Sequence, residues 1–343
     1  TGQRLYNEFG LTKPMNWTAG FLQPTIKYRS VTYELDRPFA DIENSPNAGS
    51  LMASFDGGLI FERQTSLFGQ SMTQTLEPRV YYLYSQYEEQ IFQPDFDTAE
   101  LTFSYGQLFR DTRFSGNDRL DDANQLSVGV TSRYLDNETG EEKLSVSLGQ
   151  IYYFRDREVR LNAFDPELAE NTSPLAGEFS WSPNPQWQLR ASALYDTNDN
   201  TFDAASAQAT YFPWSGAVLS VGYTLREPPP SLLERPVTEQ ANVSAYASIT
   251  DHWSVFGALE YSLEGSTAVE DMVGFEYDNC CWRLRVLYMR YIDTERGEIP
   301  NFSDPNLNRE NAIQVQFLLK GMGGFGGRVD NLLKDMIRGF ADR

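Results

Sequence analysis

Residues 271–288, DMVGFEYDNCCWRLRVLY, form the clearest hairpin signature in the chain. In the second half of this stretch, Trp282, Leu284, Val286 and Tyr288 share one face, and Arg283 and Arg285 share the other. Alternation of this kind is typical of a strand with one apolar and one polar face. Residues 278–281 between the two halves predict a short turn.

The same period of two recurs along most of the chain. It predicts roughly fourteen strands, many of them about nine to thirteen residues long, as expected of tilted membrane strands. Strands of soluble sheets average only about five or six residues. The predicted strands are 25–35, 51–63, 72–84, 125–134, 143–155, 175–181, 187–195, 201–212, 217–225, 241–249, 253–263, 271–277, 282–288 and 311–319.

The links between these strands alternate in length. Short turns are predicted at 183–186, 213–216, 250–252 and 278–281, and longer links at 156–173, 227–239, 264–270 and 292–310. Outer-membrane barrels have short periplasmic turns and longer external loops. Tryptophans gather near the short turns and tyrosines near the opposite strand ends, as in two interfacial aromatic girdles. The pattern therefore predicts an all-β, antiparallel transmembrane barrel of the bacterial outer membrane.

Alternation also predicts which side chains meet lipid. Leu189, Val221, Leu259 and Val286 are expected on the lipid face, and Gln188, Arg190, Ser254, Arg283 and Arg285 on the lumen face. Pro24 and Pro78 lie in or beside predicted strands, and a proline has no N–H to donate to a strand ladder. These prolines indicate either weak strand pairing or local bulges, and we favour bulges.

Composition limits the partners and the chemistry. The 343 residues carry a formal net charge of -20, which argues against nucleic acid because phosphate binding needs Lys and Arg. The only histidine, His252, lies on a predicted turn. No metal motif, P-loop or Rossmann glycine pattern is present. We therefore expect a protein that is not an enzyme and that uses no cofactor or metal.

Cys280 and Cys281 are the only cysteines, and they are adjacent. Neighbouring Cα atoms are about 3.8 Å apart, below the roughly 4.4–6.8 Å usual for a disulfide, so a bond between the two is not expected. Spacing alone leaves two interpretations open, two free thiols or two disulfides to partners outside this chain. The predicted periplasmic turn favours disulfides because the periplasm is oxidising.

Several motifs resemble one family. They are QTLEPR (74–79) followed by Tyr82, Leu83 and Tyr84, the strand SLGQIYYF (147–154), the adjacent cysteines, and a loop motif of Leu108, Phe109, Arg110, Phe114, Ser115, Gly116, Asp118, Arg119, Ala123, Asn124 and Gln125. Together they resemble the C-terminal region of the LPS-assembly protein LptD family, also called the organic solvent tolerance protein family. The resemblance extends over about residues 72–319.

The resemblance implies a partial barrel that belongs to a lipopolysaccharide (LPS) translocon, integral to the outer membrane and open to the cell surface. It implies a plug lipoprotein, LptE, and an N-terminal periplasmic jelly-roll of the same protein that takes LPS from a periplasmic bridge. Cys280 and Cys281 would each pair with an N-terminal cysteine. LPS would leave sideways between the first and last barrel strands. The earliest strands and the jelly-roll are expected to lie outside this chain.

The last strand of this lateral gate is predicted to contain Asn311, Ala312, Ile313, Gln314, Val315, Gln316, Phe317, Leu318 and Leu319. Residues 1–320 are expected to form the barrel portion, and 321–343 a Gly-rich link with a short amphipathic tail helix. The alternative is a general porin-like diffusion channel. A porin barrel is self-sufficient, however, and has no need of two cysteines directed at outside partners.

Overall fold

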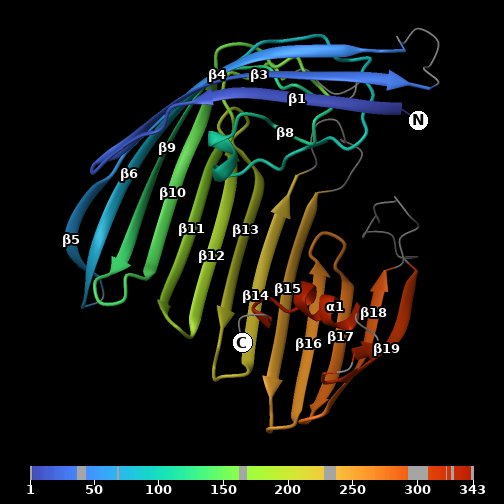
Figure 1. Cartoon of the computed structure of the whole chain (residues 1–343). Coiled ribbons are helices and arrows are strands. Elements are labelled where there is room, and N and C mark those ends of the chain that lie inside the picture. The colour runs from blue at the N-terminus through green and yellow to red at the C-terminus, as the bar shows by residue number, and fades with distance from the viewer. Residues whose placement is uncertain are drawn as a thin grey trace. The chain divides into compact units, whose positions relative to one another are not determined.

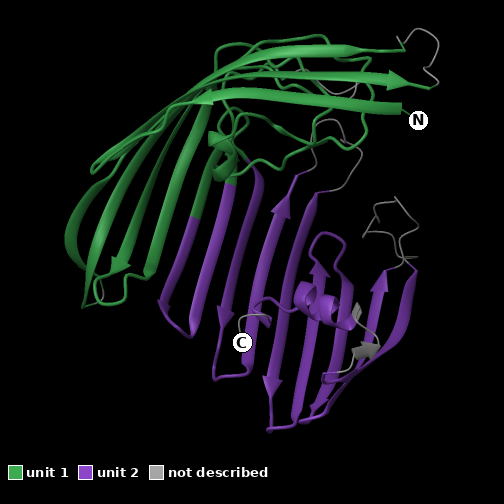
Figure 2. Ribbon diagram, in the orientation of Figure 1, with its two compact units in different colours: residues 1–178, 194–201 green, residues 179–193, 202–343 purple. Residues whose placement is uncertain are grey.

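The computed structural model describes residues 2–36, 44–67, 69–161, 168–227, 237–292, 308–321, 323–325 and 328–340. This part of the chain is nearly all strand, with one 3₁₀-helix and one α-helix (Figure 1). It divides into two compact units, residues 1–178 with 194–201 and residues 179–193 with 202–343 (Figure 2). None of the described helices has the length and apolarity needed to span a membrane.

The first unit is an antiparallel meander in which β1, β3, β4, β6, β9 and β10 pair in that order. The short strands β2, β5 and β7 pair with β3, β6 and β8. The bounds are β1 Gly2–Thr12, β2 Met15–Trp17, β3 Gly20–Leu35, β4 Asn47–Leu59, β5 Phe61–Leu67, β6 Gln70–Ser85, β7 Ala99–Glu100, η1 Tyr105–Phe109, β8 Phe114–Ser115, β9 Ala123–Asp136 and β10 Glu142–Tyr153.

The second unit continues as hairpins, in which each strand from β13 to β20 pairs antiparallel with the next. The bounds are β13 Thr201–Tyr211, β14 Ala217–Arg226, β15 Thr238–Ser248, β16 Trp253–Ser262, β17 Thr267–Asp278, β18 Trp282–Ile292, β19 Arg309–Leu319, β20 Gly323–Phe325 and α1 Arg328–Met336. Strands β11 Leu175–Asn184 and β12 Trp187–Asp196 contribute residues to both units.

The all-β class predicted from the alternation is confirmed. Every predicted strand coincides with an observed one, except that 51–63 is divided into β4 and β5. The sequence prediction missed β1 and the short strands β2, β7, β8 and β20. The predicted short turns join hairpins, whereas the links at 227–239 and 292–310 lie largely outside the described residues. The longer link predicted at 264–270 is wrong, because β17 begins at Thr267 and only 263–266 separate it from β16.

The break between β4 and β5 lies opposite Pro78. Gly58 of β4 pairs with Arg79 of β6, and Phe61 of β5 pairs with Leu76 of β6. The same number of residues therefore separates the two pairs on each side of the ladder. The favoured bulge at Pro78 is therefore wrong, and so is the one at Pro24, because β3 pairs with β4 past Pro24 without a register shift. A proline has no N–H to donate, and the ladder toward β4 and β5 is interrupted there without an extra residue.

The two faces of the second unit's sheet differ as the alternation predicted. Val221, Leu259 and Val286 lie on one face, where Val221 is 52% and Leu259 37% exposed. Ser254 and Arg285 lie on the opposite face and are buried. The apolar face is the one expected to meet lipid.

Aromatic rings line the turn end of that apolar face. The ring centroids of Trp253 and Tyr277 are 4.9 Å apart, those of Tyr277 and Trp282 are 4.9 Å apart, and those of Trp282 and Phe317 are 5.9 Å apart. The four residues belong to β16, β17, β18 and β19. Such a row is what an interfacial aromatic girdle requires.

The assignment of faces makes a direct prediction. Val221→Arg puts a charge on the expected lipid face between Ala209 and Val243, where no charged residue pairs with it, and such a charge costs about 2–4 kcal/mol at the bilayer midplane. Ser254→Arg points into a cavity of about 430 Å³ whose lining includes Glu276 and Asp278, so the new charge has carboxylate partners. We expect a much lower folding yield in lipid vesicles for Val221→Arg than for Ser254→Arg, measured by heat-modifiable gel mobility. Equal yields would contradict the facing.

Candidate functional site

The long segment between β6 and β9, which carries the loop motif, packs against the strands of the first unit. Two facing glycines make room for it. Gly129 and Gly149 pair across β9 and β10. A Cβ at Gly149 would lie 2.6 Å from Leu108 Cδ1, and one at Gly129 would lie 2.8 Å from Phe109 Cζ. The helix η1 therefore packs directly against the backbone of β9 and β10 at these glycines, and Leu108 is fully buried.

Phe109 and Tyr105, also on η1, reach neighbouring strands. The Arg79 guanidinium of β6 lies 4.2 Å from the Phe109 ring centroid, a cation–π contact, while Arg79 also forms an ion pair of 2.6 Å with Asp56 of β4. The hydroxyls of Tyr105 and Thr131 lie 3.0 Å apart. Residues of the loop motif thus contact β6, β9 and β10.

Asp118 is the most completely bonded acid of the loop. Its side chain has 0% exposure. It accepts hydrogen bonds from Arg4 Nη1 (2.7 Å), the Tyr33 hydroxyl (2.8 Å), the N–H groups of Phe96 and Asp97 (2.9 Å each) and the Thr98 hydroxyl (3.1 Å). Burial opposes ionisation, but the bonds from Arg4 and the two N–H groups outweigh it and hold the pKa of Asp118 well below its usual range. Asp118 thereby joins the loop to β1 and β3.

Arg119, the next residue, donates only to backbone carbonyls among the residues that the structure describes. It is 5% exposed. Its acceptors are the carbonyl oxygens of Gln93, Pro94, Asp118, Arg160 and Leu161, at 3.0–3.2 Å. This guanidinium ties the start of the loop to the segment that follows β10.

A second pair of acids secures the end of the loop. Asp121 accepts two bonds from the Arg113 guanidinium, at 2.8 and 3.1 Å, and a third from the Arg113 N–H at 2.6 Å. Burial raises the pKa of Asp121, with Arg113 opposing the rise. Asp122 pairs with Arg155 at 3.3 Å and accepts from the Val159 N–H at 2.9 Å.

Asp111 makes the corresponding contact with β3. Its Oδ2 lies 2.9 Å from Lys27 Nζ and 2.5 Å from Arg29 Nη2. Burial opposes ionisation of Asp111, but Arg29 and Lys27 lower its pKa below the usual value. Within the described residues no group of three or more His, Cys, Asp or Glu could hold a metal ion. Asp111, Asp118, Asp121 and Asp122 are instead each paired with an arginine or a lysine.

The remaining loop-motif residues lie at the ends of the same segment. Phe114 and Ser115 form β8, which pairs with β7. Gly116 has φ +71°, and a Cβ there would lie 2.7 Å from the Asp97 carbonyl oxygen, so the turn favours glycine. Ala123, Asn124 and Gln125 begin β9. Arg110 is exposed beside η1.

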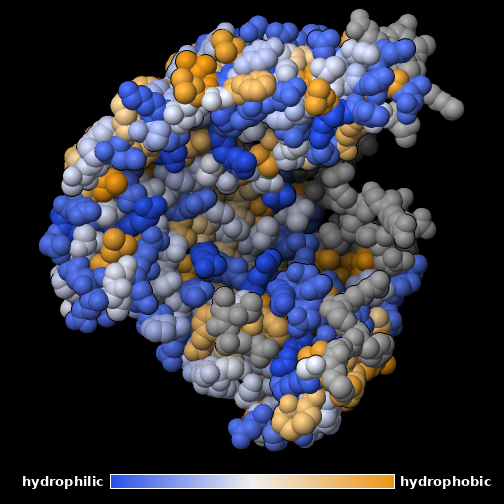
Figure 3. All heavy atoms as spheres, viewed as in Figure 1, coloured by the Kyte–Doolittle hydropathy of each residue, from blue (hydrophilic) through white to orange (hydrophobic). Residues whose placement is uncertain are grey.

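A cavity of about 180 Å³ lies beneath the loop. Its lining combines apolar side chains with three arginines and includes Leu83, Phe103, Arg110, Arg113, Tyr153 and Arg157. The cavity beneath the loop is therefore lined by both apolar and cationic groups. In Figure 3, hydrophilic residues predominate on the surface of the first unit that is turned toward the viewer.

The cysteine turn lies in the second unit, between β17 and β18. Cys280 and Cys281 are both exposed and free, with their Sγ atoms 2.8 Å apart. The hydrogen bond to the neighbouring thiol raises the pKa of Cys280. The Cys281 carbonyl accepts a 2.9 Å bond from the N–H of Lys320, which follows β19 directly. The turn is thus linked to the end of the last long strand.

That strand, β19, contains all nine residues predicted for the lateral gate. It pairs with β18 along its whole length, from Arg309 to Leu319. On its other edge, within the described residues, only Phe317, Leu318 and Leu319 pair with a strand, the short β20. Residues 323–325, predicted as part of a flexible link, form that strand.

The chain matches the family model "LptD: LPS transport system D" over residues 1–253. It belongs to the LptD family. The LPS-assembly protein LptD of Xanthomonas campestris pv. campestris (strain 8004) is 36% identical over 353 residues, which cover 99% of this chain and 42% of that protein. The LPS-assembly protein LptD of Alcanivorax borkumensis is 37% identical over 340 residues, which cover 99% of this chain and 43% of that protein.

The chain thus spans less than half the length of these LptD relatives. The resemblance inferred from motifs in residues 72–319 is confirmed and extends over nearly the whole chain. A mutant of the ferric enterobactin receptor PfeA from Pseudomonas aeruginosa matches with a TM-score of 0.40 and 10% identity, covering 93% of this chain and 55% of the receptor chain. As a member of the LptD family, the chain is part of an integral β-barrel protein of the bacterial outer membrane.

Sequence reasoning identified the LptD loop motif but missed the residues that hold it in place. Arg4, Tyr33 and Arg113 complete the contacts of Asp118 and Asp121, and none of them stood out in the sequence. Gly129 and Gly149 did carry a signal, because a glycine inside a strand marks a close approach of another segment. With two such strands adjacent, the docking position of η1 could have been predicted.

Proposed function

We propose that this chain is the C-terminal barrel portion of an LPS translocon that inserts lipopolysaccharide into the outer leaflet. Residues 1–320 form part of the barrel wall, and residues 321–343 form the link and tail. The observation that carries this proposal is the match to proteins named LPS-assembly protein LptD over 99% of the chain. The protein is a transporter in this account and has no enzymatic activity.

In this proposal the polar and apolar faces of the strands have different roles in transport. The polar saccharide passes along the hydrophilic side, while acyl chains remain sheltered from water. The exit is the seam between β19 and the first barrel strand, which lies outside this chain. An edge without a strand partner cannot stay open to lipid, because a bilayer offers no hydrogen bonds to backbone N–H and C=O groups. The limited pairing of the second edge of β19 is consistent with a contact that another strand completes.

The partners follow from the same proposal. They are LPS itself, the plug lipoprotein LptE, the N-terminal periplasmic jelly-roll of the same protein and the periplasmic LPS bridge. With a formal net charge of -20, the chain has no role for nucleic acid in this account. Energy for transport enters through the bridge, because transfer through a barrel is passive.

Controlled depletion of the full-length parent protein tests the proposal against a porin-like channel. We expect newly made LPS to stop reaching the cell surface as the protein is depleted, measured by surface labelling of pulse-labelled LPS. Uptake of small solutes by the same cells is measured in parallel and should be unchanged. Normal LPS delivery combined with reduced solute uptake would instead establish a diffusion channel and overturn the proposal.

The cysteine turn gives a separate prediction. In the full-length protein, Cys280 and Cys281 should each form a disulfide to a periplasmic segment that precedes this chain. Peptide mapping under non-reducing conditions measures the pairing. Two free thiols in the mature protein, or a bond between Cys280 and Cys281, would refute it.

A further inference from the structure

The buried face of the second unit's sheet carries one apolar row that runs across the strands. Val218, Tyr246, Phe256, Gly274 and Leu287 pair in succession from β14 to β18. The four side chains of this row are at most 4% exposed. Gly274 leaves room for its neighbour, because a Cβ there would lie 2.5 Å from the Phe256 ring.

The adjoining row on the same face is polar. Ser254, Glu276, Arg285 and Gln316 pair in succession from β16 to β19. An apolar row beside a polar one, on the face turned away from the expected lipid, requires a cover that excludes water. The cover is the C-terminal segment of the chain.

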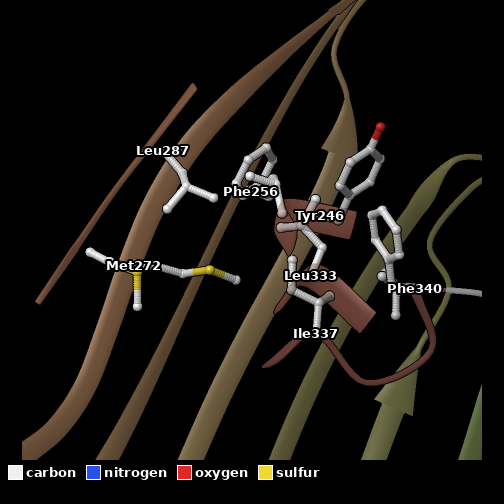
Figure 4. Packing of buried hydrophobic residues seen from close by; sticks show 10 residues of the cluster. Tyr246, Phe256, Met272, Leu287, Leu333, Ile337 and Phe340 are labelled. Carbon is white, nitrogen blue, oxygen red and sulfur yellow. The ribbon is translucent and has the colours of Figure 1, made fainter. Parts of the chain in front are cut away.

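Residues 328–340, which we call the strap, cover the apolar row. Val329, Leu333, Ile337 and Phe340 follow helical spacing and are 0–5% exposed. They form one cluster with Val218, Tyr246, Phe256, Met272 and Leu287 (Figure 4). The rings of Phe340 and Tyr246 meet edge to face with centroids 5.3 Å apart. The amphipathic helix predicted from the sequence is thus present and docks on its own sheet.

The strap crosses the strands instead of following them. At one end, Asp330 accepts a 2.7 Å bond from Arg285 Nη1. At the other end, Gly339 has φ +79°, and a Cβ there would lie 3.1 Å from Val218 and 3.2 Å from Phe212. The strap therefore extends from β18 to the β13–β14 hairpin.

Arg285 connects the strap to the last strand by hydrogen bonds, and Ala312 of β19 also packs against the apolar cluster of the strap. Arg285 is 1% exposed. Its Nε donates to Glu276 of β17 at 2.5 Å, and its Nη1 donates to Gln316 of β19 at 2.9 Å as well as to Asp330 of α1. A buried charge keeps such partners because an unpaired one would be costly. Movement of the strap must therefore change the environment of β19.

The strap has the properties of a two-state element. Helix α1 has nine residues, and isolated helices shorter than about 12–15 residues are marginal in water. The segment is therefore helical when docked and unfolds when released. The short connection after β19 keeps a released strap at a high effective concentration near the sheet, so docking is readily reversible.

We propose that residues 328–340 form a releasable strap that holds β19 against the sheet, and that release of the strap loosens the edge of β19 through which cargo would leave. The role in cargo exit rests on the proposed function. The mechanical coupling between strap and strand does not depend on it.

Hydrogen exchange on the full-length protein with its plug partner, in detergent and without added LPS, tests the coupling. Asp330→Asn removes the carboxylate charge that pairs with Arg285. Leu333→Glu places a charge on the strap where it packs against the apolar row. Asp335→Asn, which makes the same change of charge at an exposed position of α1, is the control. We expect amides of residues 311–316 to exchange roughly tenfold faster in both strap variants, a shift of about 1.4 kcal/mol in opening. Exchange in the first unit should change less than about twofold, and β14–β16, which the strap also covers, should accelerate less than residues 311–316.

Unchanged hydrogen exchange in β19 of both strap variants would overturn the proposal. Equal acceleration in all strands of the second unit would also overturn it, because it would make the segment an ordinary part of the core. If Leu333→Glu does not accumulate, Asp330→Asn alone decides the result. Because the measurement requires no lipopolysaccharide, its failure is distinguishable from a failure of the proposed function.

Discussion

Asp118→Ala is expected to lower the free energy of unfolding of the first unit by about 3–5 kcal/mol, the cost of removing one partner from a buried ion pair. The substitution leaves two N–H groups, those of Phe96 and Asp97, without the acceptor they share at 2.9 Å. Arg4 keeps Asp97 as a partner at 2.6 Å, but Asp97 is exposed. The loop should therefore detach from β1 and β3 before the strands themselves separate.

Limited proteolysis of the purified full-length protein measures this detachment. We expect cleavage within residues 92–122 to become at least about tenfold faster in Asp118→Ala, which corresponds to 1.4 kcal/mol or more of local opening. Glu89→Ala removes the same charge from an exposed position of the same loop and should change the rate little, because exposed pairs contribute about 0–1 kcal/mol. Equal cleavage of the two variants would mean that Asp118 does not hold the loop.

The pH dependence of the loop follows from the direction of the Asp118 pKa. A carboxyl whose pKa is lowered by folding stabilises the folded state above its unfolded pKa of about 3.9. That contribution is lost as the pH falls below about 4 toward the lowered folded-state value. We expect the native loop to become sensitive to protease on acidification in this range, and Asp118→Ala to lose part of that pH dependence.

The strands were predictable because their signal is local. Period-two alternation in 125–134, 253–263 and 282–288 fixes both the strand and its faces, since adjacent side chains must point to opposite sides. The division at Ile60 was not predictable in this way. It depends on the proline of a neighbouring strand, which alternation within β4 does not report.

The covering segments were harder to predict because their partners are remote in sequence. Arg4 and Asp118 are separated by 114 residues, and Arg285 and Asp330 by 45 residues. Helical spacing predicted α1, but nothing local indicates that its apolar side matches Tyr246 and Phe256. That match appears only when the register places those two side chains in one row.

β1 was missed for a different reason. Leu5, Phe9 and Leu11 share one face and are 63–77% exposed, with polar residues between them. The alternation is present but is interrupted at Asn7, which takes the place of an apolar residue on that face. A uniform count of alternation from Gly2 onward would have found it.

The second large effect concerns the seam at β19. Ile313 is suited to cross-linking because its side chain is 72% exposed, whereas Gln316 is bonded to the buried Arg285. A disulfide between Ile313→Cys and a cysteine at the facing residue of the first barrel strand should abolish surface delivery of LPS while the barrel stays folded. The physical reason is that a covalent link keeps the two edges paired, so no gap opens toward the lipid.

Surface delivery of pulse-labelled LPS in cells that carry this cross-linked full-length protein tests the lateral-exit account most directly. Each single-cysteine variant is the control for the substitutions, and heat-modifiable mobility reports the folded barrel. The account predicts delivery at background in the cross-linked protein and near-normal delivery in both single variants. Normal delivery with the seam fully cross-linked would contradict exit between β19 and the first barrel strand.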